Sequence, residues 1–193
     1  LAIAAATWLL LVASAGGADW TTQFLANEPV KHGSFELLTG DDVLQEARVI
    51  APATFQAGGS FASFILPLAR GQRTPARIGD LSRMTWQFDG ELRWRSGPRR
   101  LKIDRWRVTT SDRRLTARVG RSRMTVGILD KSWMTAWTVA EEGRGYWPAS
   151  SQGPIRLSRK FRLAFRRNIG RTPPRRIEGS ISLAIPVKPD PSR

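Results

Sequence analysis

The sequence comprises 193 residues, of which 41% are hydrophobic and 24% charged, a balance typical of a chain that buries a core. Lysine and arginine number 31 against 16 acids, giving a net charge of +15, and all but five of these cations are arginines. The absence of cysteine excludes disulfides, thiolate metal sites and cysteine nucleophiles. The charge favours anionic partners, and solvated arginines without a partner are the alternative interpretation.

Residues 1–18 form a nearly unbroken apolar run ending in small residues, which is typical of a secretory signal peptide. Since a membrane span requires about 20 apolar residues, a retained anchor is the second interpretation. Either one predicts that the rest of the chain is secreted or associated with the cell envelope. We expect a single β-rich domain over residues 19–187 and a short tail over residues 188–193.

The first part of this domain shows the order strand, helix, strand. Thr39 and Asp42 approximate a capping box, which predicts a short helix through Val43, Leu44 and Ala47. The apolar run over residues 61–68 then predicts a strand that ends at Pro67.

Alternation of apolar and polar residues predicts four strands between residues 84 and 129. A hairpin at Asp89-Gly90 would place aromatic and charged side chains on the same face, so one long strand is favoured, with Gly90 at a bulge or a close approach. The alternation of the second strand slips at Asp104-Arg105, as it would at a β-bulge. Together the four strands predict an antiparallel meander. The first strand carries on one face Trp86, Phe88, Leu92 and Trp94.

Near the carboxyl end, Ser158 is the expected N-cap of a helix that ends at Gly170, with Phe161, Phe165 and Ile169 on its apolar face. Strand, helix, strand thus occurs twice, which predicts two related halves that contribute to a sheet. The fold class we predict is mainly β: an antiparallel β-meander or sandwich with two short α-helices.

Few groups suit catalysis. With one histidine and no cysteine, a nucleophilic triad would depend on His32 alone. The adjacent acids Asp41-Asp42 and Glu141-Glu142 are typical of helix caps and loops rather than of a glycosidase pair. Phosphate-binding and dinucleotide-binding motifs and metal-ligand spacings are absent. We therefore predict a binding protein with no catalytic residues and no metal site; a secreted hydrolase is the least favoured class.

Five framework motifs and the later helix follow one another along the chain: Pro52-Ala-Thr54, Phe64-Ile-Leu-Pro67, Phe88-Asp-Gly-Glu-Leu92, Leu115-Thr-Ala-Arg-Val119, Gly127-Ile-Leu-Asp130, and Leu157-Ser158 to Gly170. Their order resembles the HtaA-type domain of bacterial surface proteins over most of residues 35–187. That resemblance implies a β-rich exported module, with haem capture or transfer at the cell envelope as its function. It also leads us to expect a tyrosine ligand after a Trp-Gly…Ser-Phe pattern, whereas His32-Gly-Ser-Phe35 is followed by no tyrosine.

If haem is the cofactor, its iron needs an axial ligand, and the candidates are His32, in a polar segment, and Tyr146, in a predicted glycine-containing loop over residues 145–148. That loop could line a pocket or close one end of the domain, and His32 could simply be solvated. The alternative function is binding of an anionic cell-wall polymer or membrane surface. Nucleic acid is not an expected partner, and the sequence predicts no oligomeric state. The candidate polyanion-binding residues are Arg93, Arg95, Arg162 and Arg166.

Overall fold

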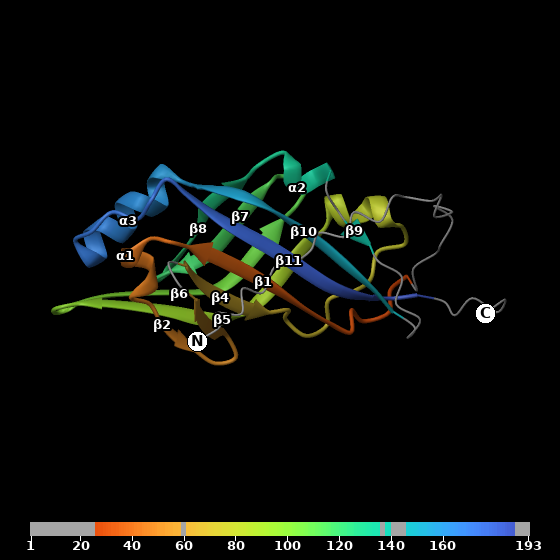
Figure 1. Cartoon of the computed structure of the whole chain (residues 1–193), viewed down its shortest axis with the longest axis horizontal. Helices are drawn as coiled ribbons and strands as arrows, with labels where there is room; N and C mark the ends of the chain where they lie inside the picture. The colour runs from red at the N-terminus through yellow and green to blue at the C-terminus, as the bar shows by residue number, and fades with distance from the viewer. Residues whose placement is uncertain (1–25, 59–60, 136–137, 140–145, 188–193) are drawn as a thin grey trace, which may run out of the picture.

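The computed structural model describes residues 26–58, 61–135, 138–139 and 146–187 (Figure 1). The predicted leader (residues 1–18), the tail (188–193) and the acids Glu141 and Glu142 lie outside the described residues. The strands are β1 (His32–Thr39), β2 (Arg48–Ile50), β3 (Thr54–Gly58), β4 (Phe61–Pro67), β5 (Thr85–Ser96), β6 (Arg99–Thr109), β7 (Arg114–Val119), β8 (Ser122–Leu129), β9 (Thr138–Val139), β10 (Tyr146–Leu157) and β11 (Arg176–Pro186). The helices are α1 (Asp42–Gln45), α2 (Ser132–Thr135), α3 (Arg159–Ile169) and the 3₁₀ helix η1 (Ile78–Arg83).

The strands form one antiparallel sheet in the order β2-β5-β6-β7-β8-β10-β11-β1-β4-β3, with β9 paired to β10. Strands β5 to β8 are consecutive neighbours, which confirms the predicted meander. The first and last long strands of the chain, β1 and β11, pair with each other in the second half of the sheet. The prediction of a mainly β, antiparallel fold is therefore confirmed.

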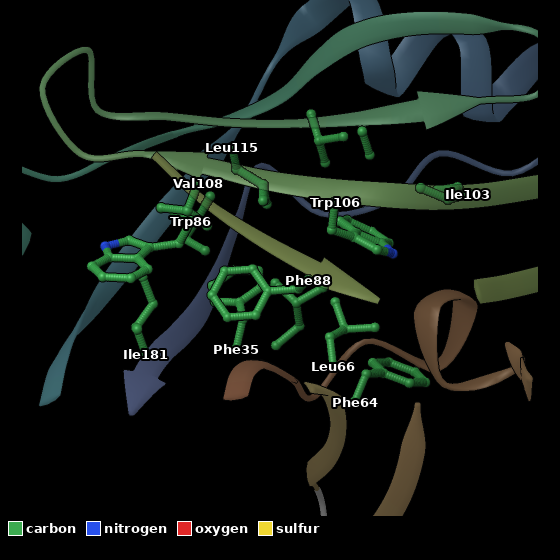
Figure 2. Close-up of a cluster of buried hydrophobic side chains, with 14 of the residues drawn as sticks. Phe35, Phe64, Leu66, Trp86, Phe88, Ile103, Trp106, Val108, Leu115 and Ile181 are labelled. Carbon is green, nitrogen blue, oxygen red and sulfur yellow. The ribbon is translucent and has the colours of Figure 1, made fainter. Parts of the chain in front are cut away.

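The two ends of the sheet approach each other. Leu68, just after β4, forms an isolated bridge with Phe88 of β5, and the Ala69 N–H donates to the Gln87 carbonyl at 2.8 Å. The inner face of the sheet consequently encloses one hydrophobic cluster, in which Phe35 lies 5.4 Å from Phe88 between ring centroids (Figure 2).

Gly90 marks the bulge predicted in β5. The strand is continuous, as expected, but its register to β6 shifts between Phe88 and Glu91. Gly90 has φ +112°, and a Cβ added to it would lie 2.5 Å from the Ala53 Cβ, so glycine is required both by the backbone and by the close approach. A second shift in the pairing of β6 with β7 confirms the bulge predicted after Asp104.

The cap of α1 differs from the predicted capping box. Its N-cap is Asp41, whose Oδ1 accepts from the Leu44 N–H at 3.1 Å. Thr39 is still part of β1, paired with Ala62, and its Oγ1 accepts from the Asp41 N–H at 3.0 Å. The prediction of Thr39 as cap was wrong because strand pairing extends through this residue, and the helix starts only after the chain has left the sheet.

Helix α3 has the predicted caps. Ser158 Oγ accepts from the Phe161 N–H at 3.1 Å, and Gly170 closes the helix in the left-handed conformation with φ 86°. Phe161, Phe165 and Ile169 are buried, and Phe165 packs edge-on against Trp94 of β5 at 5.2 Å between ring centroids. The helix thus covers the apolar side of β5, β6 and β8.

Two strand-helix-strand units occur, as the sequence predicted. β1 and β4 flank α1 and pair with each other, and β10 and β11 flank α3 and do the same. The predicted loop over residues 145–148 was wrong for its described part, because Tyr146 begins β10 and pairs with Pro186. The sequence pattern does not predict a strand here, because the segment contains Pro148, Pro154 and the serines between them. The segment is nevertheless a strand, because it pairs with β11.

Candidate functional site

The fold brings His32 and Tyr146, the two candidate haem ligands, into contact. They begin β1 and β10, the strands on either side of β11, where His32 pairs with Ala184 and Tyr146 with Pro186. Their ring centroids lie 5.7 Å apart with the planes at 69°, an edge-to-face arrangement. His32 is exposed and Tyr146 is half-buried. We call these two rings and the neighbouring Lys31 the ring cluster.

Lys31 completes this cluster, since its Nζ lies 4.5 Å from the centroid of the Tyr146 ring. The cluster lies on the outer face of the sheet, because side chains alternate along β1 and Phe35, three residues beyond His32, points into the core. Ala184 shares this outer face with His32 and is nevertheless only 3% exposed.

The donor chemistry of the ring cluster suits an iron centre. Phenolate oxygen and imidazole nitrogen both serve as axial ligands of haem iron, and a lysine ammonium beside them stabilises negative charge. Sequence reasoning identified Tyr146 and His32 separately but could not show that they meet, and it missed Lys31. Among the residues that the structure describes, histidine and acidic side chains nowhere form a group of three or more that could hold a metal ion.

A second feature is a cleft of about 520 Å³ lined mainly by residues of β2, β5 and β6, which we call the basic cleft. Five cationic side chains and a single acid line it. The buried Trp94 and Leu101 also contribute to its lining. The charged residues of the cleft are Arg48, Arg93, Arg95, Arg100, Lys102 and Glu46.

Strand register places like charges directly opposite one another in the basic cleft. Arg48 of β2 pairs with Arg93 of β5, and Arg93 pairs with Lys102 of β6. Two residues farther along β5, Arg95 pairs with Arg100. Directly opposite residues of an antiparallel pair have Cβ atoms about 5 Å apart, so this arrangement is electrostatically unfavourable for the sheet itself.

Two acids beside the cleft neutralise only part of this charge. Glu91 forms ion pairs with Arg93 and Lys102, and Asp104 pairs with Lys102 at 3.1 Å and with Arg118 Nη2 at 2.5 Å. The hydrogen bonds from Arg118 outweigh burial and hold the pKa of Asp104 below its usual value. Burial acts to raise the pKa of Glu91, but Lys102 and Arg93 outweigh it and lower that pKa. Both carboxylates are therefore ionised at neutral pH and remain paired with these cations.

The four predicted polyanion-binding arginines divide into two groups. Arg93 and Arg95 line the basic cleft, whereas Arg162 and Arg166 belong to α3 and do not line it. Arg162 Nε donates to the Pro173 carbonyl at 3.2 Å, and Arg166 is exposed. Sequence reasoning missed the remaining cations of the cleft because β2 was not recognised and because strand register cannot be read from local pattern.

Two other cavities are smaller. An apolar cavity of about 30 Å³ lies in the core beneath α3, and a polar one of about 260 Å³ is lined by Arg113, Arg156, Arg176 and Asp130, among others. Neither of these cavities, nor the basic cleft, is lined by a ring of the ring cluster.

Comparison with known proteins gives one structural match of note. Neither a protein-family model nor a curated protein matches the sequence. Among solved structures, the C-terminal domain of HtaA from Corynebacterium glutamicum is similar, with a TM-score of 0.50 and 13% sequence identity over 81% of this chain and 98% of that domain. The chain has an HtaA-like fold. The resemblance seen in the framework motifs is confirmed at the level of the fold.

Within this HtaA-like fold the two candidate sites lie far apart. Figure 1 shows the hairpin between β5 and β6 at one end of the long axis, while β1 and β10 begin toward the other end. Substitutions at the ring cluster and in the basic cleft can therefore be tested independently.

In the described part of the chain, none of the helices is both long enough and apolar enough to cross a membrane.

Proposed function

We propose that this chain is a non-catalytic binding module at the cell surface or envelope, and that it captures or transfers haem at the ring cluster. The observation that carries the proposal is the contact between Tyr146 and His32, two residues of ligating chemistry that the HtaA-like fold brings together from separate strands. The likeness to a domain of HtaA supports the same class of function.

The residues present fit haem iron in their chemistry. Tyr146 would supply the phenolate ligand, and His32, at its edge, would stabilise the ligand by a hydrogen bond or take its place. Lys31 offers a cation to a haem propionate. Haem would lie on the outer face of the sheet where β1 and β10 begin, beside His32 and Tyr146. When bound, haem supplies an iron centre whose absorption reports the identity of its ligand.

Titration with haemin tests this proposal. We expect a saturable Soret band whose position changes in Tyr146→Phe, which keeps the ring and removes only the ligating oxygen, together with an affinity loss of about tenfold or more. His32→Gln should shift the band while retaining binding. Phe61→Ala, which removes an exposed aromatic on β4, is the control for non-specific adsorption and should leave the spectrum unchanged. The absence of saturable binding, or an identical spectrum for Tyr146→Phe and the unsubstituted protein, would refute the haem assignment.

A further inference from the structure

The basic cleft contains cations that the described acids do not neutralise, although Arg95 Nε donates to the Gly97 carbonyl at 3.4 Å. Arg48, Arg95 and Arg100 form no ion pair with any residue that the structure describes, whereas Arg93 and Lys102 are engaged by acids. All three unpaired arginines are exposed and line the same cleft. Two of the like-charged cross-strand pairs, Arg48 with Arg93 and Arg95 with Arg100, include these arginines. The repulsion within these pairs lowers the stability of the sheet unless an anion occupies the cleft.

The number and spacing of the cations favour a chain of anionic groups over a single small anion. Neighbouring strands lie about 4.8 Å apart, and alternate residues on one strand about 6.8 Å apart. Cations at such spacings on three strands can engage several anionic groups in succession. The cleft is not an enclosed cavity, so a linear polymer can enter and leave it without threading.

The arginine content favours phosphate as the anionic group. Four of the five cations are arginines, whose planar guanidinium donates to phosphate or carboxylate in pairs of hydrogen bonds. The oxygens of a phosphate point in several directions, so one group can bridge arginines that face each other across two strands, as Arg48 and Arg93 do. A carboxylate can also pair with two cations, as Glu91 does with Arg93 and Lys102, but its two oxygens lie in one plane and accept from fewer directions than those of a phosphate.

The surroundings of the cleft distinguish it from a membrane or nucleic-acid surface. An interfacial membrane site needs apolar side chains beside the cations, but the large exposed hydrophobic residues that the structure describes, Phe55, Phe61 and Leu163, do not line the cleft. Single-stranded nucleic acid needs exposed aromatic rings for base stacking. Trp94 lines the cleft but is only 4% exposed, since it packs on Phe165 and its indole N–H donates to the Val43 carbonyl at 3.1 Å.

From these observations we infer that the basic cleft is a second binding site, independent of the ring cluster, for a linear phosphodiester polymer that carries no nucleobases. Arg48, Arg95 and Arg100 bind its phosphates, while Glu91 and Asp104 hold Arg93 and Lys102 in place along the cleft. The site would attach the module to a phosphate-bearing polymer and leave the ring cluster free.

Binding of poly(glycerol phosphate) to the full chain tests this inference. We expect saturable binding that weakens by more than tenfold between about 50 and 200 mM salt, because each phosphate contact releases counterions. The double variant Arg48→Gln/Arg95→Gln should lose a further tenfold or more at fixed salt. The matched control, Arg166→Gln/Arg167→Gln, removes the same charge from exposed positions of α3 and should change the affinity by less than about twofold.

Thermal unfolding of the same variants separates loss of the site from loss of the fold. Removing the repulsion between Arg48 and Arg93 should leave the melting temperature of the cleft variant unchanged or raised. An equal loss of affinity in the α3 control would refute the site, because it would show binding to net charge alone. Equal or tighter binding of polyglutamate, of phosphatidylglycerol vesicles or of single-stranded DNA would overturn the assignment to a phosphodiester polymer that carries no nucleobases.

Discussion

The close approach at Gly90 makes a quantitative prediction. In Gly90→Ala the new residue must adopt φ +112°, which costs about 1–3 kcal/mol for a residue other than glycine. Its Cβ would also lie 2.5 Å from the Ala53 Cβ and 3.1 Å from the Leu66 Cδ2, and overpacking of this kind costs about 1–3 kcal/mol more. We expect the free energy of unfolding to fall by about 2–6 kcal/mol, measured by urea denaturation followed by tryptophan fluorescence.

Two further variants separate the backbone term from the steric one. Gly97→Ala introduces a side chain at φ +59° with nothing within 4 Å of the new Cβ, so only the backbone cost of about 1–2 kcal/mol should appear. Adding Ala53→Gly to Gly90→Ala removes the atom that clashes and should recover part of the loss in a double-mutant cycle. Equal destabilisation at Gly90 and Gly97, or no coupling between Gly90 and Ala53, would show that the close approach does not determine the choice of glycine.

Two other predictions concern α3 and the acids beside the basic cleft. Phe165→Ala removes a fully buried ring that packs on Trp94 and should lower the free energy of unfolding by about 3–5 kcal/mol, whereas Leu163→Ala, on the exposed face, should change it by less than about 0.5 kcal/mol. Because Arg118 lowers the pKa of Asp104 in the folded state, the ion pair stabilises the protein above about pH 4 and is lost as the pH falls through the lowered pKa. Asp104→Asn should therefore be less stable at pH 7 and lose less stability between pH 5 and pH 2 than the unsubstituted protein in urea titrations; parallel pH profiles would contradict this.

Local patterns predicted those parts of the fold whose causes are local. The alternation from Trp86 to Trp94 identified β5 and its bulge, and Ser158 and Gly170 identified both ends of α3. Each of these signals lies within a few residues of the structure it specifies. The same is true of the framework motifs that indicated an HtaA-like fold.

Features that depend on pairing between distant segments could not be predicted. Strand β10 contains two prolines and two serines, and it exists because β11 supplies a partner from Tyr146 to Arg156. The contact of His32 with Tyr146 likewise depends on their common neighbour β11. The opposition of Arg48 and Arg93 depends on the register of β2, which has only three residues and no recognisable alternation.

The pairing of β1 with β11 also dictates when the sheet can be completed. β11 joins β10 to β1, so a chain that still lacks residues 176–186 leaves both of those strands with an open edge. Open edges promote association between chains, and contacts between the two ends of a sequence slow folding because a long loop must close first. A nascent chain of this protein thus keeps an edge of β1 and an edge of β10 unpaired until residues 176–186 have been made and have joined the sheet.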